Sequence, residues 1–194
     1  PAKPPDDTRG YSGTDATDVT AHVVASREMM RSRVRGLTAQ AAGTGIYPLI
    51  LPSLPCFRMT RRLAGSRTLT EEDHGTWTND AVGMFGDWRR AGPVYALPLA
   101  CLTGVRNRNL LAAGRCISAE GAAWDVARAI PACAVSGQAA GVAAALAAAE
   151  TAGEVKAVPL GGLRKELNAQ TVILDAALLD TRPAGPSAGN AART

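Results

Sequence analysis

Residues 132–149 contain no charged side chain and consist mostly of alanine and glycine. The stretch belongs to a predicted helix from about Ala129 to Glu150, with Pro131 tolerated in its first turn. A transmembrane helix needs about 20 strongly apolar residues, and alanine gains little from lipid compared with leucine or phenylalanine. We therefore expect a soluble helix that packs closely on both sides, and no membrane association.

The segment before this helix is predicted to bring polar backbone groups and positive charge together. Asn109–Gly114 is predicted to be a short buried strand closed by glycine, and residues 115–128 form a connector without a strong period. The following helix begins with unpaired N–H groups and the positive end of its dipole, which can hold an anion or a polarised carbonyl. Arg115 and Arg128 add charge. The alternative is an ordinary strand–loop–helix unit with solvated arginines.

The remaining elements follow from hydrophobic spacing and from capping and breaking residues. Thr70 and Asp73, three residues apart, are typical of a helix start. A glycine at position 153 can cap the long helix. The further predictions are a flexible arm at 1–14, a helix at about 19–37 broken by Gly43 and Gly45, an edge strand or buried loop at 46–57, a strand at 95–102, a helix at 163–179 and a disordered tail at 181–194.

Cysteine, histidine and charge exclude several classes of protein. The four cysteines form no C-x-x-C pair and only two histidines are present, so we expect no metal site. The start of the chain is polar and proline-rich, without the apolar stretch of a signal peptide, and we expect reduced thiols in a cytoplasmic protein. Net charge is +4, but the arginines are scattered without interleaved aromatic residues, which argues against nucleic-acid binding.

Several ordered motifs within residues 14–150 carry a family resemblance. The sequence NLLAAGRCISA at 109–119, followed by RAIPACAVSGQAAG at 128–141, resembles the C-terminal signature of bacterial FAD-dependent oxidoreductases. The 13-residue spacing between Arg115 and Arg128 matches the family. Upstream, RMTRR at 58–62, LTEED at 69–73 and Y-x-L-P at 95–98 resemble further family blocks.

The resemblance implies an α/β fold in which a substrate domain is inserted into a flavin-binding domain. Residues 15–104 would be the α+β substrate-domain portion, 105–152 the C-terminal strand and helix of the flavin-binding domain, and 153–180 a further helical segment. The G-x-G-x-x-G motif that holds the pyrophosphate in such folds is missing, since Gly43-Thr-Gly45 lacks a third glycine. We therefore expect either a partner chain that carries the G-x-G-x-x-G half or a truncated product.

Cofactor-binding residues are assigned by the same resemblance. Gly114 and Arg115 would face the ribityl–pyrophosphate side of FAD. The N–H groups of Ala129 and Ile130, next to Arg128, would meet the N1/C2=O edge of the flavin. Negative charge collects at that edge in the reduced flavin, and the end of a helix dipole stabilises it.

Arg58 and Arg61 are predicted to bind a carboxylate of a small-molecule substrate, because the guanidinium fork suits carboxylates; solvated surface charges are the alternative. No residue is assigned a catalytic role. The chain departs from the family pattern at Met59, at 120–122 and at Asp125, where the family usually has an acid, a T-H-E sequence and a glycine.

Two hypotheses for function follow. The first is a component or fragment of an FAD-dependent oxidoreductase that transfers hydride between an organic substrate and flavin, and that needs a second chain to complete the FAD site. The second is a non-catalytic binding or structural subunit that retains the fold and has lost the cofactor.

Overall fold

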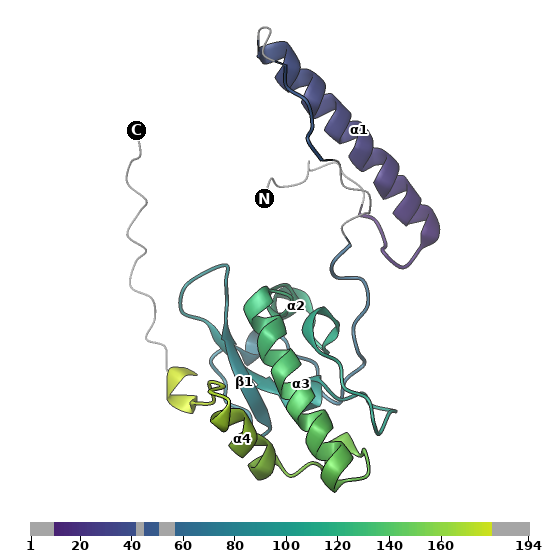
Figure 1. Ribbon diagram of the computed structural model, residues 1–194. Coiled ribbons are helices and arrows are strands. Elements are labelled where there is room, and N and C mark those ends of the chain that lie inside the picture. The colour runs from purple at the N-terminus through teal and green to yellow at the C-terminus, as the bar shows by residue number, and fades with distance from the viewer. Residues whose placement is uncertain (1–9, 42–44, 51–56, 180–194) are drawn as a thin grey trace. The chain divides into compact units, whose positions relative to one another are not determined.

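The computed structural model describes residues 10–41, 45–50 and 57–179. They form two compact units, residues 1–61 and residues 62–194 (Figure 1). Most of the predicted arm at 1–14 and all of the predicted tail at 181–194 lie outside the described residues. The predicted division at 104/105 falls inside the second unit and stays an assignment by resemblance.

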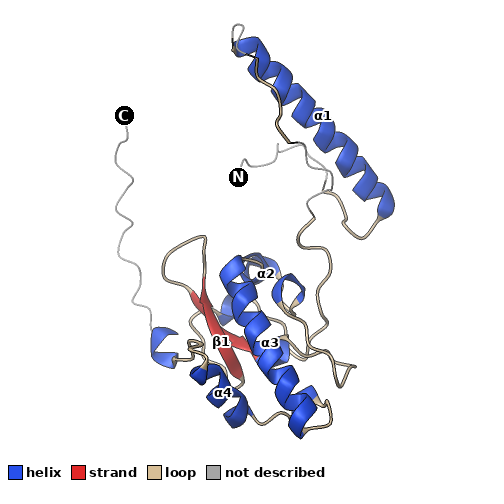
Figure 2. Ribbon diagram, in the orientation of Figure 1, coloured by secondary structure: helices blue, strands red, loops and turns tan. Residues whose placement is uncertain are grey.

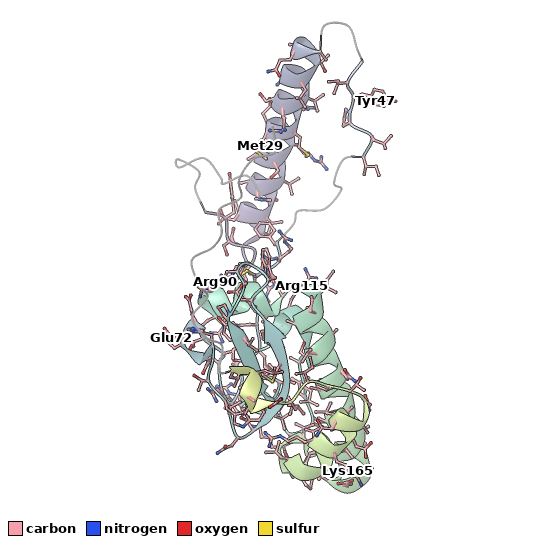
Figure 3. The ribbon with its side chains drawn as sticks, turned by 90° about the vertical axis from the view of Figure 1, so that its left-hand side faces the viewer. Met29, Tyr47, Glu72, Arg90, Arg115 and Lys165 are labelled. Carbon is pink, nitrogen blue, oxygen red and sulfur yellow. The ribbon has the colours of Figure 1, made fainter. Side chains whose placement is uncertain are left out.

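The first unit contains one long helix, α1 (Ala16–Gln40). Asp15 is its N-cap, and the Asp15 side chain accepts the N–H of Asp18 at 2.8 Å. None of its residues is buried. Met29 and Tyr47, labelled in Figure 3, are 62% and 75% exposed. The expectation of an edge strand or buried loop at 46–57 is wrong for residues 46–50, which form an exposed loop because none of the described residues of the unit covers them. Residues 51–56 and Gly43 lie outside the described residues.

The second unit is built on a two-stranded antiparallel sheet. Strand β1 (Ala81–Gly86) pairs with β2 (Val94–Pro98), with Gly86 opposite Val94 and Ala81 opposite Pro98. The strand predicted at 95–102 is therefore confirmed as far as Pro98; a 3-10 turn, η2 (Leu99–Cys101), follows it. The predicted helix start at Thr70 is confirmed as a capping box, but the helix is only the 3-10 turn η1 (Glu71–Asp73).

Helix α3 (Ile130–Glu150) crosses the face of β1 (Figures 1 and 2). A Cβ added to Gly83 of β1 would lie 2.3 Å from Cγ1 of Val135, so the glycine is what lets helix and strand approach. The predicted helix is confirmed, including Pro131 near its start, and the Gly153 N–H closes its end by donating to Ala147 O at 2.8 Å. Helix α4 (Leu160–Ala169) packs against α3 and β1.

Close packing on both sides of α3 is not what the described residues show. A Cβ added to Gly137 or Gly141 would meet nothing within 4 Å, and only a third of the most apolar window of the helix is buried. By length and composition alone, α3 is long and apolar enough to cross a membrane. The core helix of a soluble protein has the same composition, so this indication is weak.

Three expectations near α3 are wrong. Residues 109–114 form no strand: Leu111 makes a single bridge to Thr103, and the Ala112 N–H donates to Leu102 O, because no further strand of the described residues lies alongside. The predicted connector contains a 3-10 turn, η3 (Gly114–Cys116), and helix α2 (Gly121–Ala127). The helix predicted at 163–179 ends at Ala169, because Thr171 takes a positive φ of 63° and β-branched residues follow it.

The α/β class is confirmed, since helices pack on a small sheet. The core lies where β1, β2, α2, α3 and α4 meet. Its largest fully buried side chains are Leu69, Val82, Tyr95, Leu97, Leu102, Ile117, Val126, Leu163 and Leu167.

Candidate flavin-binding site

Turn η3 packs against the first half of α3 through one internal hydrogen bond. The Gly114 N–H donates to Ser136 Oγ at 2.9 Å, and the Ser136 hydroxyl donates in turn to Cys133 O at 3.1 Å. Gly114 has φ +67°, a conformation that favours glycine. Trp124 of α2 also holds the turn, because its Nε1–H donates to Arg115 O at 2.9 Å. The Gly114 N–H is thus used inside the protein.

The N-cap of α3 directly follows Arg128, the C-cap of α2. Its N-cap, Ala129, offers no side-chain cap, and the Ala129 N–H donates to Val126 O at 3.0 Å. Of the two N–H groups predicted to meet flavin, only that of Ile130 has no partner within the described ranges. Ile130 is 86% exposed, so the described part of the second unit leaves this residue at the start of α3 uncovered.

The predicted residues Gly114, Arg115, Arg128, Ala129 and Ile130 are brought together by these contacts. Arg115 is exposed, on the turn that packs against α3. Figure 3 shows it at the same end of the second unit as Arg90, opposite Lys165 of α4. Their roles toward FAD stay predictions.

Asp125 compensates the charge of Arg128. Its Oδ1 accepts both Nε (2.8 Å) and Nη2 of Arg128, and its Oδ2 lies 4.0 Å from Arg89 Nη1. The Trp88 Nε1–H donates to Asp125 O at 3.3 Å, which ties the β1–β2 turn to α2. Arg128 is therefore the partner of an acid that the family pattern usually lacks.

A second carboxylate, Asp87, anchors the same cluster from the β1–β2 turn. The Asp87 side chain is completely buried and accepts Arg89 Nε at 2.9 Å and Arg89 Nη2 at 2.7 Å, with Arg90 Nε 3.7 Å away. The hydrogen bonds from Arg89 lower the pKa of Asp87, against the opposing effect of desolvation. Arg90 also forms an ion pair with Glu71 of η1, in which Nη2 and Oε1 are 3.6 Å apart.

Sequence reasoning missed this cluster, because its members come from η1, the β1–β2 turn and α2, and no local pattern relates them. It also missed the Tyr95 hydroxyl, which is buried with no hydrogen-bond partner in the described part of the chain. Burial is the main cause that raises the pKa of Tyr95.

The cysteines near the site differ in exposure. Cys116 is exposed and Cys133 is half-buried. Burial raises the pKa of Cys133, whose thiol lies 3.5 Å from Arg128 O. Deeper burial raises the pKa of Cys101 to about 12. All three are free thiols, and Cys56 lies outside the described residues.

A groove of about 510 Å³ lies farther along α3. Asn109, Leu110 and Leu111 form one wall, and Gly141, Ala144 and Ala148 of α3 lie opposite. The residues of α3 that line the groove have small, apolar side chains or none, so the backbone of another segment can approach them closely.

The predicted substrate residues Arg58 and Arg61 are exposed and belong to the first unit. Their role stays a prediction. Among the described residues, no group of three histidine, cysteine or acidic side chains could hold a metal ion.

The described part of the second unit is thus a turn and a long helix packed on a small sheet. The chain belongs to the FAD dependent oxidoreductase family, whose family model matches residues 2–167. No curated protein and no solved structure matches the chain. Membership implies FAD as cofactor and an oxidoreductase type of function.

The described residues fit one end of FAD. The exposed first turn of α3, with the Ile130 N–H free in the described part, suits the polar edge of an isoalloxazine ring. A glycine-rich phosphate cradle is missing from the full sequence.

Proposed function

We propose that this chain supplies the flavin-facing part of an FAD-dependent oxidoreductase that acts on a small organic molecule. Bound FAD would accept or return a hydride. The observation that carries the proposal is the convergence of turn η3, Arg128 and the exposed start of α3, in a chain that belongs to this family. The helix dipole at Ile130 would stabilise negative charge on the ring edge, and Arg115 would add positive charge beside it. Arg58 and Arg61 would bind a substrate carboxylate.

A second polypeptide carrying G-x-G-x-x-G completes the FAD site in this proposal. Two observations support it: the motif is absent from all 194 residues, and the described residues leave the mainly apolar groove between 109–111 and α3 uncovered. The uncovered stripe at Gly137 and Gly141 suits a closely packed helix. We further propose a cytoplasmic hetero-oligomer without membrane or nucleic-acid partners.

Flavin retention tests this function. The chain is purified alone and after co-expression with the product of the neighbouring reading frame, and flavin absorbance is measured per protein. We expect flavin only in the co-expressed complex. Tightly bound flavin in the chain alone would contradict the need for a partner, and no flavin in either sample would contradict the cofactor role.

The alternative is a non-catalytic subunit that has lost the cofactor. It is favoured by one observation, that Arg128 is already paired with Asp125 while the Gly114 and Ala129 N–H groups are used internally. Redox activity of the complex, with and without Arg115→Ala and Arg128→Ala, separates the two functions. Loss of activity in the variants supports the enzyme, and an inactive wild-type complex supports the subunit.

A further inference from the structure

Arg128 has little freedom to turn toward a ligand. Two of its three guanidinium nitrogens, Nε and Nη2, are directed at the single oxygen Oδ1 of Asp125, and the Arg128 side chain is only 19% exposed. A guanidinium held by two of its donors keeps a fixed plane. Its remaining nitrogen, Nη1, has no partner within the described ranges.

Asp125 is itself held by two groups of the β1–β2 turn. The Trp88 Nε1–H bonds its carbonyl, and Arg89 Nη1 lies 4.0 Å from its second carboxylate oxygen. Arg89 in turn is bound by the buried Asp87. Asp125 therefore sits between two arginines with both carboxylate oxygens engaged, and it cannot swing away without breaking contacts on either side.

The charges of this cluster cancel. The cluster contains three arginines, at positions 89, 90 and 128, and three acids, at positions 71, 87 and 125. Each arginine has a guanidinium nitrogen within 4.0 Å of a carboxylate oxygen of at least one of these acids. The positive charge of Arg128 is therefore offset, and the helix dipole is the positive charge that remains at the start of α3. Without Asp125, the same position would carry about one full positive charge more.

We infer that Asp125 is a positioning residue that holds Arg128 and offsets its charge beside the start of α3, and so weakens the stabilisation of reduced, anionic flavin. The inference rests on the proposed function for its effect on flavin. Its effect on Arg128 is independent of any cofactor. Charge near the polar edge of a flavin tunes its electronic properties.

The cofactor-independent test measures the accessibility of Arg128. The wild-type chain and Asp125→Asn are treated with phenylglyoxal, and the rate of modification at each arginine is followed by peptide mass spectrometry. We expect Arg128 to react about fivefold faster in the variant, the factor associated with losing a partly exposed ion pair. Exposed Arg115 is the internal reference and should not change. Glu166→Gln, on the surface of α4, is the matched control.

Asp125→Glu keeps the negative charge and should leave Arg128 as protected as in the wild type. It also keeps the test informative if Asp125→Asn unfolds, because the comparison can then be made between Asp125→Glu and Asp125→Ser. An unchanged rate at Arg128 in the neutral variants would overturn the inference.

The flavin test uses the complex that retains FAD. The midpoint potential is measured by equilibration with reference dyes, and we expect a more positive value in Asp125→Asn because the reduced flavin is stabilised. Faster modification of Arg128 with an unchanged potential would overturn the effect on flavin. Absence of flavin from wild-type and variant complexes would contradict the proposed function instead, and the arginine rates would still decide whether Asp125 restrains Arg128.

Discussion

The Ser136 hydroxyl accepts the N–H of Gly114 at 2.9 Å and is itself fully buried. This bond joins turn η3 to α3 and fixes the site's geometry. We predict that Ser136→Ala lowers the free energy of unfolding by about 1–3 kcal/mol, because it leaves a partly buried N–H without an acceptor. Urea unfolding measures the change. Gln138→Ala on the same helix removes only an exposed bond to Gln170 and should stay within about 0.5 kcal/mol. Equal effects in both variants would contradict the role of Ser136.

Contact between β1 and α3 depends on the missing side chain of Gly83. In Gly83→Ala the new Cβ would lie 2.3 Å from Val135 Cγ1, and valine in a helix has essentially one rotamer to adopt. We expect a loss of about 1–3 kcal/mol from overpacking. The double variant Gly83→Ala/Val135→Ala should recover part of this loss, as a double-mutant cycle will show.

Gly141→Ala is the matched control for this prediction. Its Cβ would meet nothing within 4 Å, and alanine favours a helix over glycine, so we expect a gain of up to about 1 kcal/mol. Destabilisation by Gly141→Ala, or neutrality of Gly83→Ala, would mean that α3 packs on a different face.

Local signals were sufficient for the parts of the fold that depend on nearby residues. Pro131 and Gly153 correctly indicated the two ends of α3, because capping and termination are decided within a few residues. The same holds for the capping box at Thr70. The turn does not continue as a helix, because Gly75 takes a positive φ of 67° and its N–H donates to Val94 O.

Features that depend on distant partners could not be predicted. Residues 109–114 have a strand's composition, but a strand also needs a neighbour on which to form hydrogen bonds, and within the described ranges this segment pairs only with Leu102 and Thr103. Helix α4 is short because Thr171 turns the chain. At the site, the resemblance pointed to Gly114 and Arg128, whereas the Asp87–Arg89–Asp125 cluster arises only when the β1–β2 turn meets α2.

Acid stability provides a prediction for Asp87. Its folded-state pKa is lowered by Arg89, so ionised Asp87 contributes stability above its unfolded pKa of about 3.9, and this contribution is lost as pH falls through the lower folded value. Asp87→Asn should lower the free energy of unfolding at pH 7 by roughly 2–3 kcal/mol. This is at or below the low end of the cost of removing one partner of a buried ion pair, because Arg89 is partly exposed.

The loss should begin to shrink below about pH 4, where Asp87 becomes protonated in the unfolded chain, and should disappear as pH falls through the lower pKa of the folded state. Urea unfolding at a series of pH values between 2 and 7 measures it, with exposed Glu166→Gln as control. Parallel pH curves for wild type and Asp87→Asn would contradict the assignment.

Removal of the Tyr95 hydroxyl is expected to stabilise the folded protein. The residue is fully buried, its ring stacks on Phe85 with centroids 5.7 Å apart, and the hydroxyl has no hydrogen-bond partner in the described part of the chain. A buried group without a partner costs about 1–3 kcal/mol, so we expect Tyr95→Phe to raise the free energy of unfolding by about 1 kcal/mol while keeping the ring contacts. Tyr95→Leu, which loses the stacking and leaves a cavity, should instead destabilise by about 2–4 kcal/mol. Urea unfolding of both variants distinguishes the two contributions. A loss of stability in Tyr95→Phe would mean that an ordered water satisfies the hydroxyl.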